Sequence, residues 1–178
     1  MIRSADPSRR VDVPTAVLLG SFVLGTTDHL HELIRAARGG TPAAMRKITE
    51  AIRRTSGGVW PEITDAVVVP VPRHVPGPAH RLVMATCAEV GRTRRWPVAT
   101  DALLRTRSAS EGKAGGARDP EAEANTLTWI ASTPGSVIVL VDDVLRSGAT
   151  IQACAMAVRA SGDQRTLLAL ALARAETP

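Results

Sequence analysis

One stretch near the C-terminal end constrains this chain more than any other. Five apolar residues, Val137–Val141, run directly into Asp142 and Asp143. Four of the five are β-branched, and a continuous apolar run of this kind predicts a strand buried on both faces, as in a parallel sheet. A short loop follows at 146–148, and Ser147 is suited to cap the helix that comes next. That helix is indicated by apolar residues at helical spacing, namely Ile151, Cys154, Ala155 and Val158.

The layout of this stretch predicts an anion site. Backbone N–H groups at a helix start favour an anion, and Gly148 lets the backbone approach it closely. The hydroxyls of Ser147 and Thr150 add donors that suit a phosphate monoester. Asp142 and Asp143 stand at the carboxyl end of the strand, where ligands of open α/β sheets bind. Carboxylates only accept hydrogen bonds, so the pair suits the two hydroxyls of a ribose.

Residues 137–150 closely resemble the phosphoribosyl pyrophosphate (PRPP) motif of type I phosphoribosyltransferases. That motif is an apolar strand, two acidic residues, two mostly apolar residues and a small-residue loop that ends in Gly-Ala-Thr. The chain departs from it at Arg146, where the family usually has Thr or another small residue. The resemblance implies that Asp142 and Asp143 hold the ribose hydroxyls at the catalytic centre. It assigns the 5′-phosphate to Arg146, Ser147, Gly148, Ala149 and Thr150.

The rest of the chain alternates strand and helix patterns. This alternation predicts an α/β fold with a central, mostly parallel sheet flanked by helices. Further strands are expected at 14–25 with a break near Gly20, at 66–69, within 96–104 and at 166–174. Further helices are expected at 28–38, 41–54 and 79–90. The type I phosphoribosyltransferase fold that the resemblance implies adds a flexible lid loop and a small hood. We expect a flexible N-terminus at 1–12 and a single domain over 13–178.

A second group of residues is expected to bind the pyrophosphate. The turn Pro70–Pro72 is stiff and follows the strand at 66–69, so Arg73 can offer a charged fork there, with His74 as a weaker candidate. Residues 105–124 show no periodicity and are rich in glycine and charge, which suggests a lid over the leaving group. Its cations are Arg105, Arg107, Lys113 and Arg118. The alternatives for all of these residues are ordinary surface side chains on loops.

The chain also resembles, more narrowly, the ComF family of phosphoribosyltransferase-like proteins, over roughly residues 20–175. Those proteins are linked in some bacteria to DNA uptake. The likeness lies in the helical segment 25–54, the Pro70–Pro72 turn, Arg105–Arg107, Asn125 and the stretch 137–150. The family's N-terminal cysteine zinc module, the Gly-Phe-Asn-Gln after the turn and the lid glutamine are not in this sequence. Ala122–Asn125 stands where Arg-x-x-Asn is usual.

These features predict an enzyme that binds PRPP and Mg²⁺ and transfers the phosphoribosyl group to a nitrogen nucleophile, releasing pyrophosphate. No residue pattern identifies the acceptor. Mg²⁺ is expected to be held mainly by PRPP and water, without dedicated protein ligands. The main alternative is a non-catalytic PRPP or nucleotide sensor that acts with nucleic acid or a protein partner. A third is an unrelated doubly wound protein whose motif is fortuitous.

The composition bears on whether nucleic acid or a membrane could be a partner. The net charge of +5 allows nucleic-acid contact, but one Phe, no Tyr and three Trp offer no stacking platform for single strands. No apolar run approaches the roughly 18 residues of a membrane span. The polar N-terminus lacks the apolar core of a secretory signal. We therefore expect a cytoplasmic protein, with no membrane partner and, by resemblance, a homodimer.

Overall fold

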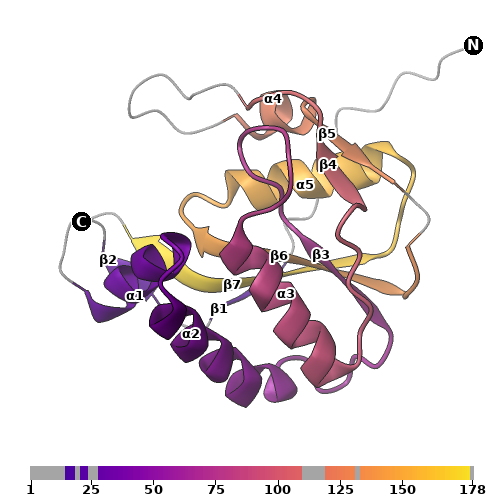
Figure 1. Ribbon diagram of the computed structural model, residues 1–178. Coiled ribbons are helices and arrows are strands. Elements are labelled where there is room, and N and C mark those ends of the chain that lie inside the picture. Colours follow the sequence, from indigo (N-terminus) through magenta and orange to yellow (C-terminus); the bar gives the residue numbers. More distant parts are fainter. Residues whose placement is uncertain (1–14, 19–20, 24–27, 110–118, 131–132, 177–178) are drawn as a thin grey trace, which may run out of the picture.

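The computed structural model describes residues 15–18, 21–23, 28–109, 119–130 and 133–176. Their centre is a parallel sheet with strands in the order β1-β7-β6-β3, and β2 also pairs with β7 (Figure 1). The strands are β1 (Thr15–Leu18), β2 (Ser21–Val23), β3 (Ala66–Pro70), β6 (Val137–Leu145) and β7 (Thr166–Glu176). The predicted parallel sheet is thus confirmed, while the N-terminal segment 1–12 lies outside the described residues.

Helices cover both faces of the sheet (Figure 1). One face packs against α1 (His29–Arg38), α2 (Pro42–Thr55) and α3 (Arg81–Arg94), and the other against α5 (Ala149–Ala160). Strand β6 contributes to both cores, because its successive side chains point to opposite faces of the sheet. Val139 and Val141 belong to the core under the first three helices, and Ile138 and Leu140 to the core under α5. The continuous apolar run of the sequence therefore reflects a strand buried on both faces.

The first two helices begin where the sequence predicts. The Asp28 side chain caps α1 by accepting hydrogen bonds from the backbone N–H groups of Leu30 and His31, at 2.7 and 3.3 Å. Thr41 and Pro42 occupy the N-cap and first position of α2, as expected. Helix α1 ends at Arg38 before two glycines, and this end points the last arginine toward the sheet's carboxyl edge, as described below.

A small antiparallel ribbon lies outside the α5 face. It pairs β4 (Leu103–Arg105) with β5 (Leu127–Trp129), and the short helix α4 (Pro120–Ala124) precedes β5. We predicted no helix within 105–124, so α4 corrects that expectation. Asp119 caps it, Pro120 starts it, and its five residues are too few to show an apolar period. A 3₁₀ turn, η1 (Ser56–Gly58), follows α2.

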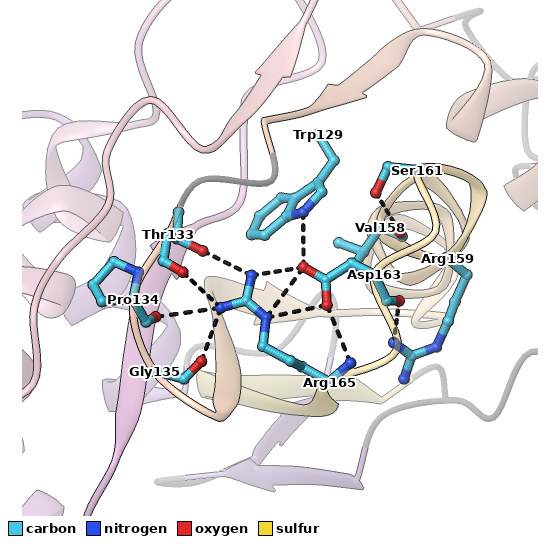
Figure 2. Close-up of polar contacts among 9 residues, drawn as sticks. All are labelled: Trp129, Thr133, Pro134, Gly135, Val158, Arg159, Ser161, Asp163 and Arg165. Atoms are coloured by element: carbon cyan, nitrogen blue, oxygen red, sulfur yellow. Dashed lines mark hydrogen bonds and ion pairs between the residues drawn. The ribbon is translucent and has the colours of Figure 1, made fainter.

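A hydrogen-bonded network ties the sheet together at its amino edge (Figure 2). Arg165, just before β7, donates to both carboxylate oxygens of Asp163 and to the carbonyls of Thr133 and Gly135. The Trp129 indole N–H donates to the same carboxylate at 3.1 Å. This network joins the segments that enter β6 and β7. None of the helices that the structure describes has the length and apolar character needed to cross a bilayer.

Candidate functional site

The carboxyl ends of β3 and β6 form one edge, as predicted. Pro70 pairs with Val141 in the sheet register, and the backbone N–H of Val71 donates to the Val141 carbonyl at 2.9 Å. The loop that follows β3 therefore starts beside Asp142. One detail differs from expectation, because β6 continues to Leu145 and the two aspartates lie within the strand. The ladder with β7 extends that far and keeps the backbone extended.

Asp143 is buried and fully paired. Only 5% of the residue is exposed, and it lies on the side of β6 that faces the first three helices. Its two carboxylate oxygens accept from Nε and Nη2 of Arg38, at 2.6 and 2.5 Å, in a bidentate ion pair. A buried carboxylate loses its hydration, and this fork supplies the replacement. Arg38 itself keeps 43% of its side chain exposed.

Asp142 carries the less favourable charge of the pair. Burial and the neighbouring Asp143 charge raise the pKa of Asp142 to about 7. One carboxylate oxygen of Asp142 accepts the backbone N–H of Asp143 at 2.8 Å, which offsets part of this effect. Part of Asp142 still reaches solvent. At neutral pH Asp142 is therefore close to the midpoint of its titration, beside a carboxylate that is ion-paired with Arg38.

The loop expected to bind phosphate leads directly from β6 into α5. Arg146 and Ser147 are exposed, and Gly148 caps the helix with a left-handed φ of +79°. Apart from its chain neighbours, no atom of the described residues lies within 4 Å of the place where a side chain on Gly148 would sit, so those residues leave the backbone there open to an approaching group. Ser147 was predicted as the cap. Instead Gly148 is the N-cap, and Ser147 lies one residue before it. The Ser147 hydroxyl still accepts the Ala149 N–H, at 3.4 Å.

The loop after β3 presents Arg73 and His74, and both residues are exposed. Hydrogen bonds to their backbone carbonyls hold this loop in place. The Arg73 carbonyl accepts from Nε of Arg105, and the His74 carbonyl accepts the Ala109 N–H at 2.8 Å. A held backbone with exposed side chains is an arrangement suited to a binding loop.

Arg105 does not occupy the place expected of a lid cation. Its side chain is fully buried, and it donates to Glu123 at 2.8 Å and to the hydroxyl of Thr126. A charged fork is retained there because the Glu123 carboxylate is buried with it. Arg107 is exposed and donates to the Asn125 carbonyl at 2.9 Å. Lys113 and Arg118 lie outside the described residues.

Several basic side chains lie around His80, and one of them, Arg38, is the ion-pair partner of Asp143. His80 caps α3, where its Nδ1 accepts the Leu82 N–H at 3.3 Å. Burial lowers the pKa of His80, the Asp143 charge opposes this, and the nearby guanidinium groups add to the lowering. Those groups are Arg38, Arg73 and Arg81. Three helix or loop ends therefore bring positive charge to the edge that holds the two aspartates.

No protein-family model and no curated protein matches this chain. The likeness to phosphoribosyltransferases therefore rests on the residues quoted above and stays a prediction. Within the described ranges, no three His, Cys, Asp or Glu side chains converge as they would around a metal ion. The two cysteines, Cys87 and Cys154, are free and buried, and burial raises the pKa of each thiol.

Sequence reasoning missed two members of this group, Arg38 and His80. Arg38 stands 105 residues away from Asp143 and looks like an ordinary basic residue in the last turn of a helix. His80 looks like a loop histidine. The only local signal was the end of α1 at Gly39, which fixes where Arg38 points but not what it meets.

Proposed function

We propose that this protein has a type I phosphoribosyltransferase fold and transfers a phosphoribosyl group from PRPP to a nitrogen nucleophile, releasing pyrophosphate. The observation that carries the proposal is the joint placement of two groups at one edge. The Asp142–Asp143 pair lies near the end of β6, and residues 146–150 lead from β6 into the first turn of α5. The loop with Arg73 starts from the neighbouring strand β3. PRPP carries a diol, a phosphate and a diphosphate on one ribose. The aspartates, the segment 146–150 and the Arg73 loop would each meet one of these groups.

Each part of the site then has a task. Asp142 and Asp143 accept the ribose hydroxyls, Asp143 through the lone pairs that its ion pair with Arg38 leaves on its two oxygens. The segment from Arg146 to Thr150, which includes the start of α5, donates to the 5′-phosphate. Arg73, with His74 beside it, binds the diphosphate as it leaves. The bond from C1 to the diphosphate breaks as the acceptor nitrogen attacks, so positive charge develops on the ribose. Holding the reactants in line and placing fixed charges around them are the main contributions of the protein.

The two carboxylates also fit the requirements of Mg²⁺, which is usually held by one or two carboxylates, water and substrate phosphates. Asp142 is the better placed of the two, since Asp143 is already paired with Arg38. Mg²⁺ would neutralise charge on the leaving diphosphate.

A second candidate, the non-catalytic PRPP or nucleotide sensor, is favoured by one observation. Arg105 is buried in an ion pair, so this cation does not reach a ligand from its present position. Among the described lid residues, Arg107 is then the remaining one of the predicted cations. The lid cations Lys113 and Arg118, the hood, the acceptor, the homodimer, the nucleic-acid contact and the cytoplasmic location all stay predictions.

The test is calorimetric titration of PRPP with Mg²⁺ into the wild type and into the double variant Asp142→Asn/Asp143→Asn. We expect binding by the wild type and none by the variant. Release of pyrophosphate in the presence of a panel of nucleobases then separates the enzyme from the sensor. Absence of PRPP binding by a folded wild type would overturn both.

A further inference from the structure

The Arg38 guanidinium uses only one of its edges to hold Asp143. The ion pair is formed by Nε and Nη2, at 2.6 and 2.5 Å from the two carboxylate oxygens. This side-on arrangement leaves Nη1 on the far edge with both of its N–H groups. Among the described residues Nη1 has no hydrogen-bond partner, and 43% of the side chain is exposed. One edge of Arg38 is thus committed to the protein, and the other is free.

The free edge lies in a region with an excess of positive charge. Arg73 comes from the loop after β3 and Arg81 from the first turn of α3, and both act with Arg38 on the same imidazole, that of His80. The Arg81 Nη1 also comes within 3.7 Å of where a side chain on Gly40 would sit, so the start of α3 adjoins the end of α1. Asp143 is ion-paired with Arg38, and Asp142 is a second carboxylate that acts on it, so three guanidinium groups face two carboxylates. The remaining charge suits a ligand group with several negative oxygens.

We propose that Arg38 is a ligand-binding residue of this site, which holds Asp143 with one edge and binds the diphosphate of the ligand with the other. This inference rests on the proposed function and deepens it. In PRPP the diphosphate is attached to C1 and the first hydroxyl of the diol to C2, so the two groups are neighbours. A guanidinium that bridges the carboxylate for the diol and the diphosphate matches that spacing.

Two ligand fragments separate this role from a purely structural one. Inorganic pyrophosphate carries only the group assigned to the free edge, and ribose 5-phosphate carries the diol and the 5′-phosphate but no diphosphate. Arg38→Lys keeps a positive charge opposite Asp143 but offers no second edge. Arg38→Gln removes the charge altogether. The control is Arg54→Gln, an exposed arginine near the C-terminal end of α2 whose surface ion pair with Glu50 contributes little.

The measurement is the affinity of each variant for PRPP with Mg²⁺, with both fragments measured by displacement of PRPP. We expect Arg38→Lys to weaken binding of pyrophosphate and PRPP by about tenfold, the loss typical of one hydrogen bond to a charged group. Ribose 5-phosphate should bind this variant as it binds the wild type. Arg54→Gln should match the wild type throughout. Thermal unfolding confirms that each variant is folded, and Arg38→Lys carries the test if Arg38→Gln is not.

Three results would overturn the inference. Equal losses for both fragments would mean that Arg38 acts only through Asp143. Unchanged affinity would mean that the free edge meets no ligand, and tighter PRPP binding would mean that Arg38 competes with the ligand. Each of these requires that the wild type binds PRPP, so they leave the proposed function intact. A wild type that binds no PRPP removes the proposed function itself and this inference with it.

Discussion

Replacing Asp142 by asparagine should stabilise the ligand-free protein at high pH and leave it unchanged in acid. The reason is that the pKa of Asp142 is raised from 3.8 to about 7 by burial and by the Asp143 charge. The folded state therefore favours the protonated form. The stability that this group contributes is fully present below about pH 4, falls as the pH rises and is lost above about pH 7. Asparagine cannot ionise, so the variant avoids this loss.

The magnitude follows from the two pKa values. The values of 3.8 and about 7 lie about three pH units apart, and each unit corresponds to about 1.4 kcal/mol. The upper limit is thus about 4 kcal/mol at about pH 8. Asp142 is only partly buried by exposed area, so solvent screens some of the charge and we expect about 2 kcal/mol. The side-chain oxygen of the introduced asparagine can still accept the Asp143 N–H, so the substitution should introduce no new defect.

The assay is urea unfolding followed by circular dichroism at several pH values between about 4 and 8, with the free energy extrapolated to water. The quantity of interest is the difference between Asp142→Asn and wild type at each pH. Asp101→Asn, which removes a carboxylate from an exposed turn, is the control and should show little pH-dependent difference. A difference that does not change with pH, or a variant less stable than wild type at about pH 8, would refute the reasoning.

Two further substitutions test parts of the scaffold by denaturant or thermal unfolding. Glu123→Gln leaves the buried Arg105 guanidinium without its partner charge. It should lower the free energy of unfolding by about 3 kcal/mol or more. A loss below about 1 kcal/mol would show that water reaches the ion pair and screens it. Gly135→Ala places a methyl group 2.9 Å from the Ala66 carbonyl carbon at a φ of +91° and should cost more than about 1 kcal/mol, whereas Gly57→Ala, with open space around it, should cost less.

The strands and the main helices were predictable because their signals are local. The β-branched run of Val137–Val141 specifies a strand buried on both faces wherever it sits in the sheet. Asp28 and the Thr41–Pro42 pair mark helix starts by their own hydrogen-bonding properties. The adjacency of β3 and β6, which places the Arg73 loop beside the aspartates, was expected only from the resemblance to type I phosphoribosyltransferases, because β4 and β5 separate the two strands along the chain.

The features that escaped prediction depend on contacts between distant residues or on very short elements. Arg105 looked like a free cation because Glu123 and Thr126 become its partners only when β4 and β5 pair. Arg38 meets Asp143 only because α1 ends beside the sheet. Strand β6 extends past the aspartates because β7 is long enough to continue the ladder, and no feature of 142–145 alone indicates it.

Charged side chains are paired differently at the two edges of the sheet. This difference argues against a protein in which residues 137–150 serve only the fold. At the amino edge, Arg165 and Asp163 satisfy one another and the carbonyls around them (Figure 2). At the carboxyl edge, Asp142 stands ionisable beside a second carboxylate, which lowers stability at neutral pH. A protein under selection for fold alone would gain by replacing Asp142, since most positions that reduce stability without a function are easily improved. Under the proposed function, the cation that offsets this charge would arrive with the ligand at the carboxyl edge.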